Sequence, residues 1–122
     1  MINIKIALLI LLLLQIKHWY IDFVNQSMEE VKSKGIYGDW PGIWHSGKHG
    51  LATAVIFSLF VSAPVAFAIG VLDFATHYHT DWTKMNYGNR DITTPQFWNH
   101  LGLDQMAHQI VYIILIGLIV WK

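Results

Sequence analysis

Residues 72–84 constrain the fold more than any other part of the sequence. They end a long apolar run, yet they carry Asp73, His77 and Asp81 at four-residue spacing. On a helix of 3.6 residues per turn these three side chains lie on roughly one face. Ionisable groups on an apolar, membrane-type helix are costly unless they face a protein interior, a partner charge, a metal or water. The rest of the chain must therefore supply the interaction partners of these three side chains.

Composition places the chain closer to membrane proteins than to soluble ones. Of its 122 residues, 54% are hydrophobic and only 13% are charged, whereas charged residues make up about a quarter of an average soluble domain. The formal net charge is zero, so no general attraction to nucleic acid is expected. The chain has no cysteine, which excludes disulfides and thiolate metal sites, but it has seven histidines.

The apolar segments predict an all-α, integral membrane four-helix bundle with short helices, forming a single transmembrane domain over 1–122. Pro64 separates the second helix from the third, because proline is tolerated in the first turn of a helix and resisted inside one. A signal peptide is the alternative for residues 4–23, but bulky Trp19 stands where a small-residue cleavage site should be. The expected helices cover residues 4–23, 44–61, 65–84 and 103–121, with polar loops at 27–42 and 85–102.

Four helices that alternate in direction bring their ionisable ends to one side of the membrane. Each helix contributes a pair at i, i+4 spacing there, and the deeper member of each pair is a histidine. The two members are separated by about 6 Å along the helix axis. One continuous helix through Pro64 would divide the pairs between opposite faces. The pairs are His18 with Asp22, His45 with His49, His77 with Asp81, and Asp104 with His108.

These side chains predict a metal site. Imidazole and carboxylate groups bind zinc, iron and manganese, and helix bundles hold two-metal sites on inward-facing side chains. We expect one or two divalent ions, with zinc as the first candidate; two ions about 3.5–4 Å apart suit phosphoester hydrolysis. The expected ligands are His18, Asp22, His49, His77, Asp81, Asp104 and His108.

Further residues are expected to act around the ligands. His45 and Asp22 are the expected catalytic residues, with His45 as a ligand or a general base. Asp73 lies one turn deeper and could orient His77 as a hydrogen-bond acceptor. The expected supporting residues are Asp73, Gln26, Gln105 and Lys84.

Two other interpretations of the converging groups stay open. They could form a polar network that satisfies its own hydrogen bonds, or they could line a proton or ion pathway. The opposite half of the bundle has no ionisable residue in 51–70 or 110–121, which counts against a pathway across the membrane.

The motifs together resemble a known family over nearly the whole chain. They are H-x-x-x-D-x-x-x-Q from His18, the lysines 32 and 34, H-x-x-x-H from His45, D-x-x-x-H-x-x-x-D-x-x-K from Asp73, and D-Q-x-x-H from Asp104. This set is similar to the small bacterial and phage membrane proteins known as domain of unknown function 3307. It is also distantly similar to membrane-bound metal-dependent hydrolases, which implies phosphoester hydrolysis by analogy.

The expected function is therefore metal-dependent hydrolysis of a lipid or a lipid-linked phosphoester at the membrane surface. The alternative is a non-enzymatic membrane component, or a small ion- or proton-conducting protein with a structural His/Asp network. Membrane lipid is the expected partner, along with a second copy or another membrane protein, and nucleic acid is not. We expect the bacterial inner membrane, with the site facing the cytoplasm because positive charge gathers near that side. Lys17, Lys32, Lys34, Lys48, Lys84 and Arg90 lie there, against Lys5 and Lys122 near the other side.

Overall fold

The computed structural model describes residues 2–121, so Lys122 lies outside the described part of the chain. The protein is all-α, with 81% of the chain helical and no strand in the described residues. Its elements are α1 (Ile4–Trp19), the π-helical turn η1 (Tyr20–Val24), α2 (Met28–Ser33), α3 (Trp40–Ser58), α4 (Ala63–Tyr87) and α5 (Pro95–Val120).

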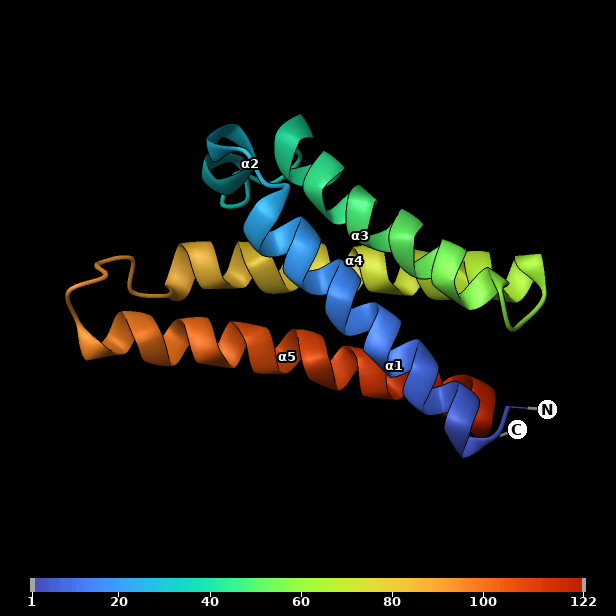
Figure 1. Ribbon diagram of the computed structural model, residues 1–122. Helices are drawn as coiled ribbons and strands as arrows, with labels where there is room; N and C mark the ends of the chain where they lie inside the picture. The colour runs from blue at the N-terminus through green and yellow to red at the C-terminus, as the bar shows by residue number, and fades with distance from the viewer. Residues whose placement is uncertain (1, 122) are drawn as a thin grey trace.

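The four long helices, α1, α3, α4 and α5, run alternately in opposite directions (Figure 1). Helix α3 packs along α4, α4 packs against α5, and α1 contacts both α3 and α5. As a result, η1, the start of α3, the end of α4 and the start of α5 lie toward the same end of the molecule, with α2 beside them (Figure 1). Both chain termini lie toward the other end.

Proline and capping residues set the starts of three helices. Pro64 stands in the first turn of α4 and Pro41 in the first turn of α3, where a missing backbone N–H costs nothing. The short helix α2 begins with a capping box, in which the Ser27 side chain accepts from the Glu30 N–H and the Glu30 side chain bonds back to Ser27.

The last helix differs from the expectation. Residues 95–102 were expected to be part of a loop, but α5 begins at Pro95. The Thr94 side chain accepts a hydrogen bond from the Phe97 N–H at 3.3 Å, and proline follows the cap directly. These two start signals outweigh the loop-like composition that Gly102 and its neighbours give this stretch.

Two glycines allow α3 and α4 to cross in close contact. A Cβ atom added to Gly50 would lie 2.7 Å from the Gly70 carbonyl oxygen, and one added to Gly70 would lie 2.6 Å from the Gly50 carbonyl oxygen. Close backbone approach over small residues is typical of helix packing in membranes. The crossing directly adjoins His49 on α3 and lies one turn from Asp73 on α4, so it fixes the relative position of the two helices that carry most of the polar residues.

The interior has an apolar half and a polar half. The apolar half lies toward the termini and consists of Ile10, Leu14, Phe57, Ala66, Ile69, Tyr112, Leu115 and Ile119, none more than 6% exposed. The polar half holds buried histidines, aspartates and lysines at the end where the helix ends converge. Many large apolar side chains, such as Leu8, Val55, Phe67 and Ile113, point outward instead.

Candidate metal centre

The π-helical turn η1 brings Asp22 to the centre of the site. Oδ1 of Asp22 lies 2.7 Å from Nε2 of His49, 2.9 Å from Nε2 of His45 and 3.6 Å from Nε2 of His77. Its backbone carbonyl accepts a hydrogen bond from the Gln26 side chain at 2.7 Å. Single π-turns within α-helices often mark functional sites, and here the turn directs a carboxylate at three histidines from other helices.

Six side chains form two groups that could hold a metal ion and that share His77. The first group is Asp22, His45, His49 and His77, and the second is His77, Asp81 and His108; within each group the ligand atoms lie within 4.8 Å of one another. We call these six residues the His/Asp cluster. For zinc bonds of about 2.0–2.1 Å, tetrahedral ligands stand about 3.3 Å apart. The Nε2 to Oδ distances around Asp81, 3.2–3.7 Å, are close to that spacing. Around Asp22, His77 at 3.6 Å is close to it, whereas His49 and His45 at 2.7 and 2.9 Å lie at hydrogen-bond distance.

The imidazole rings at the centre of the cluster are stacked. The ring of His77 lies between those of His49 and His108, with centroid separations of 3.7 and 4.0 Å. Helices α3, α4 and α5 thus each place one imidazole in a single stack. The stack turns the Nε2 atoms of His77 and His108 toward Asp81, at 3.2 Å in both cases.

Several buried polar atoms in this region have no hydrogen-bond partner in the described chain. They are Oε1 of Gln26, both ring nitrogens of His77, Oδ2 of Asp81 and Oδ1 of Asp104. Nε2 of His77 nevertheless lies 3.2 Å from Oδ2 of Asp81, and Oδ1 of Asp104 lies 3.4 Å from Nε2 of His108. Buried polar atoms are almost always hydrogen-bonded, and each exception needs an explanation. His77, Asp81 and Asp104 bring imidazole and carboxylate groups, which divalent cations prefer as ligands, into this buried region. The residues present therefore fit a metal ion.

A buried ion pair lies one layer deeper than the cluster. Nζ of Lys17 is 2.9 Å from Oδ2 of Asp73 and 2.9 Å from Nδ1 of His49. The Thr53 hydroxyl donates to the same Asp73 oxygen at 2.5 Å. Asp73 was expected to accept a hydrogen bond from His77, but its partners are Lys17 and Thr53. The four-residue spacing on α4 could not predict the ion pair with Lys17, because Lys17 belongs to α1.

Glu30 supports His45 from outside the cluster. Its Oε1 lies 3.2 Å from Nδ1 of His45 and 2.9 Å from Nζ of Lys48. Although burial acts to raise the pKa of Glu30, the bond to the Lys48 ammonium and its charge outweigh burial and hold the pKa below its usual value. Glu30 was not predicted from the sequence, where its only signal is the capping pattern of Ser27 and Glu30 in α2.

Two lysines lie against the outer aspartates. Nζ of Lys34 is 3.3 Å from Oδ2 of Asp81, and Nζ of Lys84 is 3.3 Å from Oδ2 of Asp104. Lys34 is buried, and the Lys84 side chain is 23% exposed. The cluster is therefore covered by cations on the side away from the apolar half.

Two expected ligands stand at the edge of the cluster. His18 belongs to neither metal-binding group: its Nδ1 lies 2.8 Å from the Tyr112 hydroxyl, and its Nε2 lies 2.7 Å from Oε1 of Gln105 and 3.3 Å from Oδ2 of Asp22. Asp104 belongs to neither group as well, but its Oδ1 lies 3.4 Å from Nε2 of His108. Gln105 bridges these two residues, because its Nε2 donates to Asp104 at 3.1 Å.

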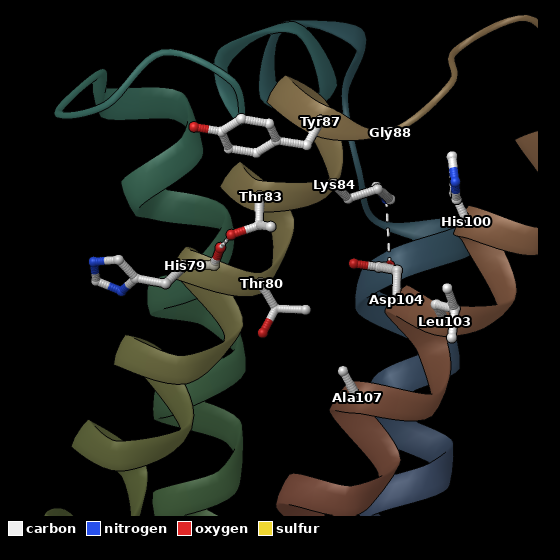
Figure 2. A pocket seen from close by; sticks show the side chains of 10 residues that line it. All are labelled: His79, Thr80, Thr83, Lys84, Tyr87, Gly88, His100, Leu103, Asp104 and Ala107. Carbon is white, nitrogen blue, oxygen red and sulfur yellow. Dashed lines mark hydrogen bonds and ion pairs between the residues drawn. The ribbon is translucent and has the colours of Figure 1, made fainter.

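A groove of about 440 Å³ runs between α4 and α5 and reaches the edge of the site. Figure 2 shows Lys84 and Asp104 paired across it, with Thr80 and Thr83 on the α4 side and Leu103 and Ala107 on the α5 side. Asp104 both lines the groove and contacts His108, so it joins the groove to the cluster.

A family model described as a protein of unknown function (DUF3307) matches residues 8–122 of the chain. Neither a curated protein nor a solved structure matches it.

Proposed function

The chain belongs to the DUF3307 family, and we propose that it is an integral membrane four-helix bundle whose His/Asp cluster binds divalent metal and hydrolyses a lipid phosphoester. Zinc is the first candidate metal, as one or two ions. The observation that carries the proposal is the presence of two buried groups that could hold a metal ion, which gather six imidazole and carboxylate side chains and share His77. Both ring nitrogens of His77 also lack a hydrogen bond of good geometry, although Nε2 lies 3.2 Å from Oδ2 of Asp81.

Membrane insertion is supported by the outer surface of the helices. The segments Ile4–Val24 and Pro95–Val120 are long and apolar enough to cross a membrane. Only 28% of each apolar window is buried inside the protein, whereas the core helix of a soluble protein would be mostly buried. With histidines and aspartates inside and leucine, isoleucine and phenylalanine outside, the protein suits a lipid environment.

Hydrolysis is supported by the surroundings of the cluster. Asp104 lines the groove between α4 and α5 together with apolar Leu103 and Ala107, so a lipid bound in the groove could reach the cluster. Lys34 and Lys84 place positive charge where the phosphoryl group would lie. A divalent ion bound in the cluster supplies activation of water and stabilisation of charge on the phosphoryl oxygens. Asp104, which lines the groove and whose Oδ1 lies 3.4 Å from Nε2 of His108, would accept the proton from water.

The first experiment measures metal content and hydrolysis together. The full chain, purified in detergent without chelator, should contain zinc by mass spectrometry. In vesicles containing a fluorescent phosphatidic acid or phosphatidylglycerol, it should release product that chelator abolishes and zinc restores. Asp104→Asn should lower the rate by about 10²–10⁴-fold, the usual contribution of a general base. Gln109→Asn, a change outside the groove, is the control.

The outcomes separate the alternatives. Absence of any transition metal, with no metal-dependent rise in melting temperature, would favour a polar network and reject the metal centre. Bound metal without hydrolysis would reject the enzyme and favour a membrane component with a structural site, for which the burial of all six cluster residues is the supporting observation. An ion pathway is disfavoured by the apolar half of the interior, where Ile10, Leu14 and Phe57 are fully buried.

We propose that the site end faces the cytoplasm of a bacterial inner membrane. Helix α2, the start of α3, the end of α4 and the loop after it lie toward this end (Figure 1), and α1 begins at the other end. The first group of segments carries Lys32, Lys34, Lys48, Lys84 and Arg90, whereas the start of α1 carries Lys5.

Cysteine labelling tests this orientation. The chain has no cysteine of its own, and Ile92 and Trp121 are 63% and 85% exposed at opposite ends of the molecule. In intact cells an impermeant maleimide should label Trp121→Cys and leave Ile92→Cys unlabelled, and lysis should expose both. Labelling of Ile92→Cys in intact cells would reverse the orientation.

A further inference from the structure

His45 and His49 occupy matched positions but have opposite partners. They stand one turn apart on α3, and both are fully buried. Their Nε2 atoms lie 2.9 Å (His45) and 2.7 Å (His49) from Oδ1 of Asp22. What differs is the group at the other ring nitrogen. Nδ1 of His45 faces Glu30, and Nδ1 of His49 faces Lys17. Because a neutral imidazole carries one proton, these partners decide what each Nε2 can do.

Nδ1 of His45 must donate, because Glu30 can only accept. Oε1 of Glu30 already receives Nζ of Lys48 at 2.9 Å, so Glu30 is a carboxylate. With its proton on Nδ1, His45 presents an unprotonated Nε2 to Oδ1 of Asp22 at 2.9 Å. Two lone pairs at that distance need a cation between them, which is either a second proton on the ring or a metal ion. A carboxylate that holds the far side of a histidine is also the usual support of a metal ligand.

Nδ1 of His49 must accept, because Lys17 can only donate. Every polar atom within hydrogen-bond distance of Nζ of Lys17 is an acceptor: Oδ2 of Asp73 at 2.9 Å, and Nδ1 and the carbonyl oxygen of His49 at 2.9 and 3.4 Å. An ammonium group with three protons fits this set. The proton of His49 is then on Nε2, where it is donated to Asp22 at 2.7 Å, a normal hydrogen-bond length.

The hydrogen-bond partners of His18 also place its proton on Nε2, as in His49. Nε2 of Gln105 donates to Asp104 at 3.1 Å, which turns Oε1 of Gln105 toward His18. Nε2 of His18 must therefore donate to that oxygen, and its Nδ1 accepts from the Tyr112 hydroxyl at 2.8 Å. Both nitrogens of His18 are engaged, and neither is free for a metal ion.

We infer that Lys17 and Gln105 remove His49 and His18 from the ligand set, so that His45, His77 and His108 supply the imidazole ligands, with Asp22 and Asp81 as carboxylates. His49 and Lys17 are positioning residues: the ammonium fixes the tautomer of His49, and the imidazole orients the Asp22 carboxylate toward the metal. This inference rests on the proposed metal centre and is independent of the proposed hydrolysis. It also narrows the ligand set that the sequence suggests.

Glutamine substitutions at the two matched positions test the inference. The side-chain amide of glutamine can place an N–H where Nε2 of histidine stands, so it keeps the hydrogen bond to Asp22 but loses the imidazole ligand. His49→Gln should keep the metal content and weaken zinc affinity by no more than about 10–100-fold, as for a supporting residue. His45→Gln should exceed that loss. Affinities are measured by competition with a zinc indicator, on full chains in one detergent.

X-ray absorption spectroscopy of the zinc-loaded wild type provides a second test, because it counts the imidazole ligands of zinc directly. The number of imidazoles per zinc, multiplied by the zinc content, should give the three rings of His45, His77 and His108 per chain, and His49→Gln should leave that number unchanged. Equal loss of affinity in both variants, or a fourth imidazole that disappears in His49→Gln, would overturn the inference. A wild type without bound zinc would instead overturn the proposed metal centre itself.

Discussion

Lys17→Met is expected to lower the free energy of unfolding by about 3–5 kcal/mol, the usual cost of leaving a buried charge without its partner. Lys17 is 8% exposed and Asp73 is 1% exposed. Methionine keeps most of the length and the apolar stem of lysine but not the ammonium. The Asp73 carboxylate would then keep only the Thr53 hydroxyl as a donor.

Neutralising the aspartate as well should recover much of this loss. In Lys17→Met/Asp73→Asn the Thr53 hydroxyl can still donate to the side-chain carbonyl, and no uncompensated charge remains. Unfolding is followed in one detergent for both variants and for Lys32→Met, an exposed position in α2 where the change should stay within about 0.5 kcal/mol. If Lys17→Met were no worse than Lys32→Met, the buried ion pair would not contribute to stability.

Gly50→Ala is expected to destabilise the protein by about 1–3 kcal/mol, the range for overpacking a closely packed interior. The added methyl group would lie 2.7 Å from the Gly70 carbonyl oxygen and 2.8 Å from Cβ of Phe74. Neither atom is the end of a flexible side chain, so α3 and α4 have to move apart. Because His49 precedes Gly50 directly, metal affinity should fall together with stability.

Gly47→Ala is the matched control on the same helix. A Cβ atom at Gly47 meets nothing within 4 Å, so only the backbone preference changes. Alanine is favoured over glycine inside a helix by about 0.5–1 kcal/mol, so this variant should be slightly more stable than the wild type. Thermal unfolding of the two variants side by side gives the comparison, and equal melting temperatures would show that the glycine crossing does not limit the approach of α3 and α4.

Much of the arrangement could be predicted because it follows from helix periodicity and chain direction. Spacing of four residues places side chains such as His77 and Asp81 on one face, and Pro64 marks where the chain reverses. From these two facts, the convergence of residues from four helices at one end can be derived. The start of α5 was missed because Thr94 and Pro95, a cap and a first-turn proline, stand in a stretch whose composition is typical of loops.

The partners of the site could not be predicted, since they depend on which side chains meet across helices. Lys17 precedes His18 and falls outside the four-residue pattern, so the sequence indicates only a lysine near the membrane surface. Nothing in the sequence joins it to Asp73 on α4. Glu30 lies in a segment that reads as a polar loop, and its role depends on α2 folding back over the start of α3.

The number of residues in the π-helical turn η1 sets how the side chains of α1 are oriented relative to Asp22. The Asn25 N–H bonds to the carbonyl oxygen of Tyr20, five residues earlier, so η1 holds one residue more than an α-helical turn would. Removing one residue from this turn would rotate everything before it by about 100° relative to everything after it. Lys17 and His18 would then swing away from the interior while Asp22 stayed in place. The number of residues in this turn is therefore constrained as strictly as the identities of Lys17, His18 and Asp22.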